Sequence, residues 1–251
     1  MIDFTQIKPE EILLKKSIKK YEKQLDFFWN ELTYLNTYIF FIKKISRWPI
    51  FMFCNPGEQI FFSFALWSFF ENSILIITKL KTDQGNELIK LLEFKNWVVI
   101  NVKKKYRSDF RTKLRKSKFD KKTEEIFDKA KNLRNYVFAH YHKYKLNKIP
   151  TLNYTELDIL YNKLYSLFDI LSFGVEHVML PFQYFDNLIH QTETDNRSTI
   201  DHLFDSLVKN SAILNLPKEE PMYWNSYKEK LDEKEIKIIN EYRKKFNFPE
   251  V

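Results

Sequence analysis

Apolar residues recur along most of this chain at the three- and four-residue spacing of an amphipathic helix. One such run passes through Ile126, Ala130, Leu133 and Val137. Two stretches, 50–53 and 98–102, favour β-structure, but each is too short to outweigh the helical pattern around it. The periodicity therefore predicts an all-α fold.

Caps and prolines set the expected helix ends. Asn55 followed by Pro56 predicts a helix start, and Thr155 with Asp158 has the spacing of a capping box. The prolines in 217–221 predict a break. The expected helices cover approximately 9–47, 56–80, 86–97, 122–144, 155–180, 199–211 and 232–246.

Two parts are expected along the chain. Residues 1–185 are predicted to form an up-and-down helical bundle. The polar stretch 186–196 is typical of a linker, so residues 186–251 are predicted to be a linker followed by a small C-terminal helical extension.

The most apolar stretch runs from Ile60 to Phe70 and resumes at Ile74 after Glu71. A membrane-spanning helix needs about 20 apolar residues with few charges, and a carboxylate in mid-membrane is costly. We therefore expect a buried core helix. The first residues lack the layout of a signal peptide, so we expect a cytoplasmic protein without membrane contact.

Scarce glycine and cysteine exclude several kinds of site. The three glycines, at 57, 85 and 174, cannot form a Walker A loop, a dinucleotide-binding turn or a lipase-type nucleophile elbow. The single cysteine, Cys54, excludes an internal disulfide and a multi-cysteine metal site. No metal and no cofactor is expected.

The positive charge is concentrated in one segment. The formal net charge is +8, yet residues 103–122 alone carry +9, with eleven Lys and Arg against Asp109 and Asp120. Such a segment favours contact with a polyanion over a merely solvated face. The candidate RNA-binding residues are Lys103, Lys104, Lys105, Arg107, Arg111, Lys113, Arg115, Lys116 and Lys118.

One short run carries candidate chemistry: Arg134, Asn135 and, six positions after the arginine, His140. RNA cleavage needs a base for the 2′-hydroxyl proton, an acid for the leaving 5′-oxygen and a cation on the phosphate. Histidine serves either proton role near neutral pH, and arginine grips two phosphate oxygens at once. None of these roles needs a metal.

Helical geometry limits how this run acts. At about 100° per residue, Arg134 and His140 both border the apolar stripe but point about 120° apart, while Asn135 lies on the other side. A frayed helix end, or a second copy across a two-fold axis, would bring the two together. The spacing alone is weak evidence, because Arg197 and His202 match it too.

The stretch LRNYVFAHYHK resembles the R-N/D-x-x-x-A-H signature of the HEPN superfamily (higher eukaryote and prokaryote nucleotide-binding helical domains). More narrowly, it looks like the AbiU-type abortive-infection branch, in which a long aromatic-rich helix precedes the motif helix, as 56–80 does here. The resemblance covers roughly residues 20–185 and leaves the tail unexplained.

The resemblance implies a homodimer whose paired motifs form one cleft, and a metal-independent endoribonuclease of a bacterial toxin–antitoxin or anti-phage system. It maps Arg134 and His140 onto the catalytic pair and Asn135 onto the polar position after the arginine. Members silenced by a nucleotidyltransferase carry H-x-Y, whereas His142 stands here at the tyrosine position. That kind of control is therefore in doubt.

Other assignments stay open. Glu71, on a thin polar stripe of the apolar helix, is a weak candidate to pair with Arg134, and it equally suits solvent or a dimer seam. The chain is alternatively a catalytically silent HEPN scaffold that binds RNA or a protein, or an adaptor on anionic lipid. The expected partners are RNA, with tRNA a candidate, a second copy, and an antitoxin or other defence protein.

Overall fold

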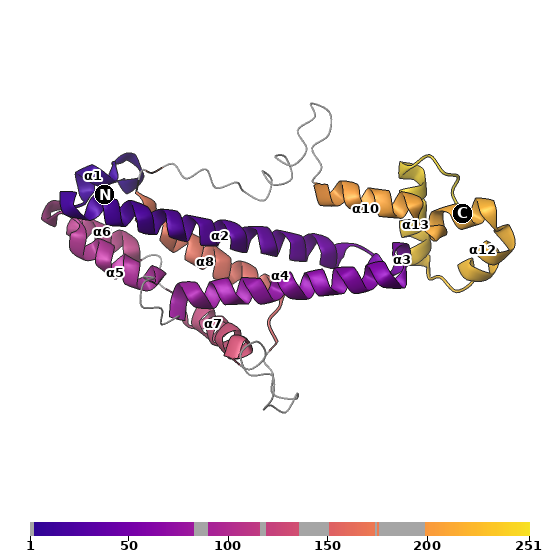
Figure 1. Cartoon of the computed structure of the whole chain (residues 1–251), viewed down its shortest axis with the longest axis horizontal. Helices are drawn as coiled ribbons and strands as arrows, with labels where there is room; N and C mark the ends of the chain where they lie inside the picture. The colour runs from indigo at the N-terminus through magenta and orange to yellow at the C-terminus, as the bar shows by residue number, and fades with distance from the viewer. Residues whose placement is uncertain (1–2, 83–89, 116–118, 136–150, 174, 176–198) are drawn as a thin grey trace. The chain divides into compact units, whose positions relative to one another are not determined.

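The computed structural model describes residues 3–82, 90–115, 119–135, 151–173, 175 and 199–251. Within these ranges every regular element is a helix, and the only β-type pairing is an isolated bridge between Leu13 and Val102. The all-α helical bundle predicted from the sequence is therefore confirmed (Figure 1).

The elements follow one another in this order. The α-helices are α1 (Pro9–Ile12), α2 (Ile18–Arg47), α3 (Ile50–Phe53), α4 (Pro56–Thr82), α5 (Leu91–Asn101), α6 (Arg107–Arg115), α7 (Lys121–Leu133), α8 (Tyr154–Ser172), α10 (Thr199–Asn210), α11 (Ala212–Glu219), α12 (Pro221–Lys228) and α13 (Glu233–Lys245). Short 3-10 turns cover Phe4–Gln6, Lys15–Ser17 and Lys104–Tyr106.

The chain divides into two compact units. Unit 1 consists of residues 1–42 and 67–182, and unit 2 consists of 43–66 and 183–251. The long helices α2 and α4 contribute residues to both. The sequence predicted a single boundary at residue 185. It did not predict that residues 43–66 group with the C-terminal helices.

Aromatic side chains from distant segments fill the core of unit 1. Tyr21 of α2 stacks on Phe94 of α5 with ring centroids 5.9 Å apart, and Phe28 lies 5.2 Å from the same ring. The Tyr21 hydroxyl donates a 2.8 Å hydrogen bond to the carbonyl of Leu171 in α8. Burial raises the pKa of Tyr21 far above its usual value, so this donor stays protonated.

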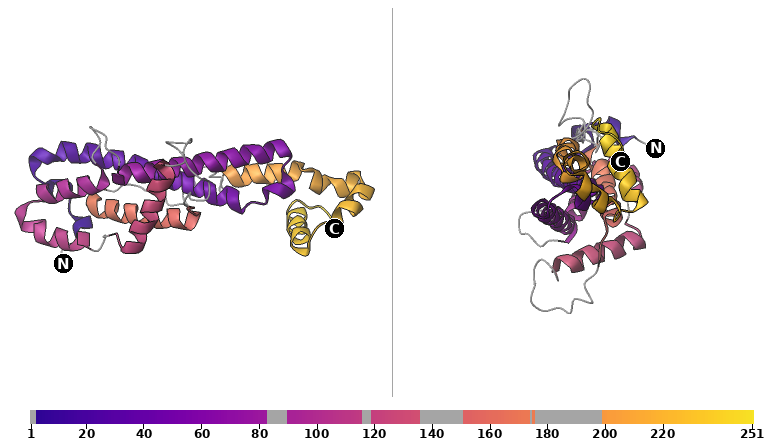
Figure 2. Two further views of the ribbon diagram at one scale, coloured as in Figure 1. Left: turned by 90° about the horizontal axis from the view of Figure 1, so that it is seen from below. Right: turned by 90° about the vertical axis from the view of Figure 1, so that its right-hand side faces the viewer.

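The helices α2 and α4 pack against each other within unit 1. Phe69 of α4 stacks on Phe41 of α2 at 5.2 Å, and Lys79 forms a 2.9 Å ion pair with Glu31. Both views in Figure 2 place the two helices alongside one another. Helix α8 in turn contacts α5, α6 and α7.

A smaller aromatic cluster forms the core of unit 2. Trp48, just before α3, stacks on Phe204 of α10 at 4.1 Å and an interplanar angle of 5°. Phe53 meets Tyr242 of α13 edge to face at 4.9 Å. These contacts, far apart in sequence, explain why residues 43–66 group with the C-terminal part of the chain.

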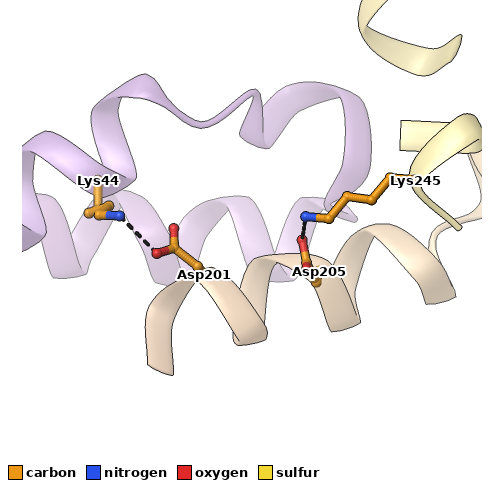
Figure 3. A network of polar contacts seen from close by, with 4 residues as sticks. All are labelled: Lys44, Asp201, Asp205 and Lys245. Carbon is orange, nitrogen blue, oxygen red and sulfur yellow. Dashed lines mark hydrogen bonds and ion pairs between the residues drawn. The ribbon is translucent and has the colours of Figure 1, made fainter. Parts of the chain in front are cut away.

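Polar contacts reinforce unit 2. Asp201 and Asp205, one turn apart on α10, pair with Lys44 at 2.8 Å and with Lys245 at 2.5 Å (Figure 3). Arg243 is 3% exposed. Its guanidinium donates to the carbonyl oxygen of Leu214, and also to that of Pro249.

Several predicted helix ends agree with the structure. Arg47 ends α2 as Trp48-Pro49 indicated, and α4 begins after Asn55. Asn55 and Glu58 form a reciprocal capping box at that start, with N···O distances of 2.9 and 3.0 Å.

Two other details of the structure differ from the prediction. Helix α8 begins at Tyr154, because Asn153 and Glu156, not Thr155 and Asp158, form the capping box. The break expected at 217–221 does occur, at the non-helical Glu220, but the short helices α11 and α12 on either side of it were not predicted. Pro217 lies inside α11, and Pro221 opens α12, where a missing N–H costs nothing.

The prediction that the apolar helix is buried was also wrong. Only 22% of the most hydrophobic 18-residue window of α4 is buried, although the helix is long and apolar enough to cross a membrane by length and composition alone. One side of α4 exposes large side chains, among them Phe64 at 72% and Phe61 at 63%. The composition of this helix did not show which side its neighbours cover.

Candidate functional site

Helix α7 leads directly into the candidate motif. Its first turn is fixed by Asp120, whose carboxylate accepts hydrogen bonds from the backbone N–H and the hydroxyl of Thr123 at 2.8 and 2.9 Å. These bonds lower the pKa of Asp120. The helix buries an unbroken apolar face, made by Ile126, Phe127, Ala130 and Leu133.

Arg134 stands at the C-terminal end of α7 in a helical backbone conformation. Its N–H donates to the carbonyls of Ala130 and Lys131, so the helical path continues through this residue. The side chains of Arg134 and of Asn135 are half-buried. Leu133, one residue earlier, is buried, so Arg134 directly follows the last residue of the buried apolar face.

His140, the other member of the predicted catalytic pair, lies outside the described residues. The convergence of Arg134 and His140 therefore stays a prediction. It was expected to need a frayed helix end or a second copy of the chain.

Glu71 lies half-buried on α4, next to side chains that the sequence grouped with it as a polar stripe. Asn72 donates to the carbonyl of Ser68 at 2.8 Å, and the buried Thr78 hydroxyl donates to the carbonyl of Ile74 at 2.8 Å. These groups are thus satisfied by their own helix. None of the ion pairs between described residues includes Glu71, and its pairing with Arg134 stays a prediction.

Two of the nine predicted RNA-binding cations serve the fold. The Lys103 ammonium donates to the carbonyls of Glu10 and Glu11 at 2.9 Å each, where α1 ends. The Arg107 guanidinium donates to the carbonyls of Ile100 and Val102 at 3.0 Å each, where α5 ends. Both cations donate hydrogen bonds to carbonyls at a helix C-terminus that have no partner within the helix. A count of charged residues cannot distinguish this structural role from RNA binding.

The other described cations of the segment face outward. Lys104, Lys105, Arg111 and Arg115 are exposed, while Lys113 is half-buried and lies over the Phe4 ring at 5.9 Å. No ion pair between described residues includes any of these five. Lys116 and Lys118 lie outside the described residues.

The charge on α6 is not balanced within the helix. Arg111 and Arg115, one turn apart, share one face, where like charges destabilise a helix by a few tenths of a kcal/mol. A neighbouring face, about 100° around the helix, buries Phe110 and Leu114, which hold α6 in unit 1. The result is a cationic surface fixed on a packed helix.

A pocket in unit 2 has no counterpart in the sequence analysis. Its volume is about 720 Å³, and its walls come from α3, the start of α4, the end of α10, α11 and α12. Cys54 lines it, and burial, together with the nearby Glu58 carboxylate, raises the pKa of the thiol to about 11. Its wall residues come from two segments about 150 positions apart, so no spacing pattern indicates it.

The described residues contain no group of three or more His, Cys, Asp and Glu side chains arranged to hold a metal ion. Comparisons of the chain with protein-family models, with curated proteins and with solved structures gave no match.

Proposed function

We propose that this chain is a cytoplasmic, metal-independent endoribonuclease of the HEPN type, acting in a bacterial toxin–antitoxin or anti-phage system. The observation that carries the proposal is the run from Arg134 to His140, which follows the amphipathic helix α7. The position of Arg134, half-buried at the border of the apolar face, supports it. A side chain at that border can lie in a cleft and still contact an RNA that binds from solvent.

The proposed reaction is an attack within the RNA strand. His140 removes the 2′-hydroxyl proton, or donates a proton to the leaving 5′-oxygen, and its counterpart in a second copy takes the other role. The 2′-oxygen forms a bond to phosphorus as the bond from phosphorus to the 5′-oxygen breaks. Arg134 holds the negative charge that builds on the phosphate, and Asn135 positions the substrate.

The cationic surface of α6 and the preceding turn supports RNA as the substrate. Exposed cations that form no ion pair with another described residue gain most from binding a chain of phosphates, because counterions are released. Lys104, Lys105, Arg111 and Arg115 fit that description.

RNA cleavage with EDTA present tests the proposal. Wild type, Arg134→Ala and His140→Ala are incubated with total bacterial RNA. A positioned proton-transfer group contributes about 10²- to 10⁴-fold, so His140→Ala should cleave at least about 100-fold more slowly than wild type. Lys131→Ala is the matched control, since it removes an exposed cation from the same end of α7 and should cleave as wild type does.

Two results would contradict the proposal. Equal cleavage by wild type and His140→Ala would remove His140 from the reaction. RNA binding with a steep salt dependence, but no cleavage by wild type, would favour the silent scaffold instead.

A further inference from the structure

The pocket of unit 2 lies wholly within that unit, since its walls come from residues 51–58 and from the helices α10, α11 and α12. Its volume of about 720 Å³ is within the range of about 300–1,000 Å³ that is usual for small-molecule sites. Like such sites, it combines mainly apolar walls with a few polar groups, here from Glu58, Ser206 and Asn210. The RNA cleavage proposed above uses none of these residues.

One formal charge faces the pocket. Among the described residues that line it, Glu58 is the charged one, and none is Lys, Arg or His. The Glu58 side chain is half-buried, and none of the ion pairs between described residues includes it. Its Oε2 accepts the backbone N–H of Asn55 at 2.9 Å, which fixes the carboxylate at the start of α4. A carboxylate has about four acceptor sites, so this cap leaves acceptor sites for a ligand.

The helix ends around the pocket do not reverse the sign of its charge. Helix α10 ends and α11 begins on either side of Ser211, so a negative and a positive dipole end adjoin and offset each other. The start of α4 carries about half a positive charge, which is less than the full negative charge of Glu58. A nucleotide or another anion would therefore set its own charge beside a carboxylate, without a cation from the described wall residues to bind it.

Aromatic rings line the same pocket and are accessible to a ligand. Phe51 is 84% exposed and Tyr227 is 41% exposed. The face of an aromatic ring attracts an organic cation that lies within about 6 Å of the ring centre. The walls thus offer a carboxylate and aromatic faces together, which is the combination that recognises an amine.

We propose that this pocket binds a small organic cation, an amine carried on an aromatic or aliphatic body. Glu58 accepts a hydrogen bond from the ammonium group. The rings of Phe51 and Tyr227 and the apolar walls contact the body of the ligand, and Ser206 and Asn210 supply further hydrogen bonds.

Calorimetric titration with probes of opposite charge tests the inference. The amines are tryptamine and the larger imipramine, and the anion is indole-3-acetate, which carries a carboxylate on the ring system of tryptamine. Both amines should bind at least about tenfold more tightly than indole-3-acetate, since a hydrogen bond to a charged group contributes at least that factor. The net charge of +8 on the chain works against nonspecific binding of amines, so this preference has to come from a local site.

Two variants of the same charge separate Glu58 from the rest of the unit. Glu58→Gln should bind tryptamine at least about tenfold more weakly than wild type, while its amide oxygen still completes the capping box with Asn55. Glu233→Gln is the matched control, because it removes the same charge from an exposed position of unit 2 outside the pocket wall. It should bind both amines as wild type does.

Alkylation of Cys54 shows whether the amine occupies this pocket. Cys54 is the single cysteine of the chain, and it lines the pocket. At about ten times the dissociation constant only about one site in eleven is free, so tryptamine should slow alkylation by iodoacetamide about tenfold. Ala212→Trp, which fills the pocket from an exposed wall position, should abolish the binding of both amines with unchanged helical circular dichroism.

The contrary outcomes are specific. The inference would be overturned if neither amine bound wild type at millimolar concentration, or if Glu58→Gln bound tryptamine as wild type does. Amine binding that leaves the alkylation of Cys54 unchanged would place the amine elsewhere on the chain, and tighter binding of indole-3-acetate would assign the pocket to an anion. None of these measurements involves RNA, so their result is independent of the proposed function.

Discussion

The two units of this chain are stabilised by different means. Unit 1 relies on large, fully buried side chains, such as Phe28 and Phe94, neither of which exposes any surface. Unit 2 has a smaller aromatic cluster and adds directional contacts, above all the buried guanidinium of Arg243. We therefore expect the stability of unit 1 to fall when buried volume is removed, and the stability of unit 2 to fall when hydrogen bonds are removed.

The largest expected effect is a truncation in unit 1. Phe94→Ala should lower the free energy of unfolding by about 3–5 kcal/mol, because it removes a ring that contacts Tyr21, Phe28 and Trp97. Urea denaturation measures the change. Tyr34→Ala, which removes an exposed ring from the same unit, should cost less than about 0.5 kcal/mol. If the two variants lost similar amounts of unfolding free energy, Phe94 would not be part of the core.

A second variant tests the hydrogen bonds of unit 2. Arg243→Met keeps the length of the side chain but leaves the carbonyls of Leu214 and Pro249 without their donor, at a cost of about 2–3 kcal/mol. Arg243→Lys keeps the charge with a single donor group and should fall between wild type and the methionine variant. If methionine proved neutral, unit 2 would depend on packing as unit 1 does.

A third test concerns the caps that begin the helices. Asn153→Ala removes the side chain that accepts the N–H of Glu156 and should cost about 1 kcal/mol. Asn153→Asp retains an acceptor at the same position and should be close to neutral. Thermal unfolding of the three proteins gives the comparison, and an unchanged alanine variant would argue against this cap.

The ion pairs of unit 2 should contribute less. Replacing both Asp201 and Asp205 by asparagine removes the two pairs in Figure 3 and should cost under about 1 kcal/mol per pair, shrinking as salt is added. Asp26→Asn is the control, because Asp26 is exposed and lies in none of the ion pairs recorded for described residues. A loss independent of salt would mean that these carboxylates act by some means other than charge.

The last prediction concerns the reactivity of Cys54 and no change in stability. Because burial raises the pKa of Cys54 to about 11, its thiolate fraction should rise about tenfold per pH unit up to that value. An ordinary thiol, with a pKa near 8.5, changes little above pH 9. Alkylation of the folded protein should therefore speed up about 100-fold from pH 8 to pH 10. A plateau above pH 9 would show that the pKa of Cys54 is not raised.

The sequence predicted unit 1 better than unit 2 for a physical reason. Helix periodicity reports which residues face a core, so it predicts the buried face of α7 correctly. Unit 2 depends on contacts between residues far apart in sequence, such as Trp48 with Phe204 and Arg243 with the carbonyl of Leu214. Such contacts produce no periodic pattern in the sequence. The exposed face of α4 was missed for a related reason, since an all-round apolar pattern does not say which side is covered.

The candidate site was predicted only in part. Arg134 and Asn135 directly follow α7, whereas the pattern predicted a helix that continues to about residue 144 with Asn135 on the side away from the apolar stripe. Lys103 and Arg107 were grouped with the substrate-binding cations because composition counts charges without their partners. Both side chains bind backbone carbonyls at the ends of α1 and α5. A count of charges does not show where those helices end.

The chemical identity of the new 3′ end is the most direct test of the central proposal. Mass spectrometry of RNA fragments produced by wild type in EDTA should find 2′,3′-cyclic phosphate ends, because the 2′-oxygen displaces the 5′-oxygen, and these ends should be missing with Arg134→Ala and His140→Ala. Fragments that end in a 3′-hydroxyl, or cyclic phosphates formed equally by wild type and both variants, would contradict the proposed roles of Arg134 and His140.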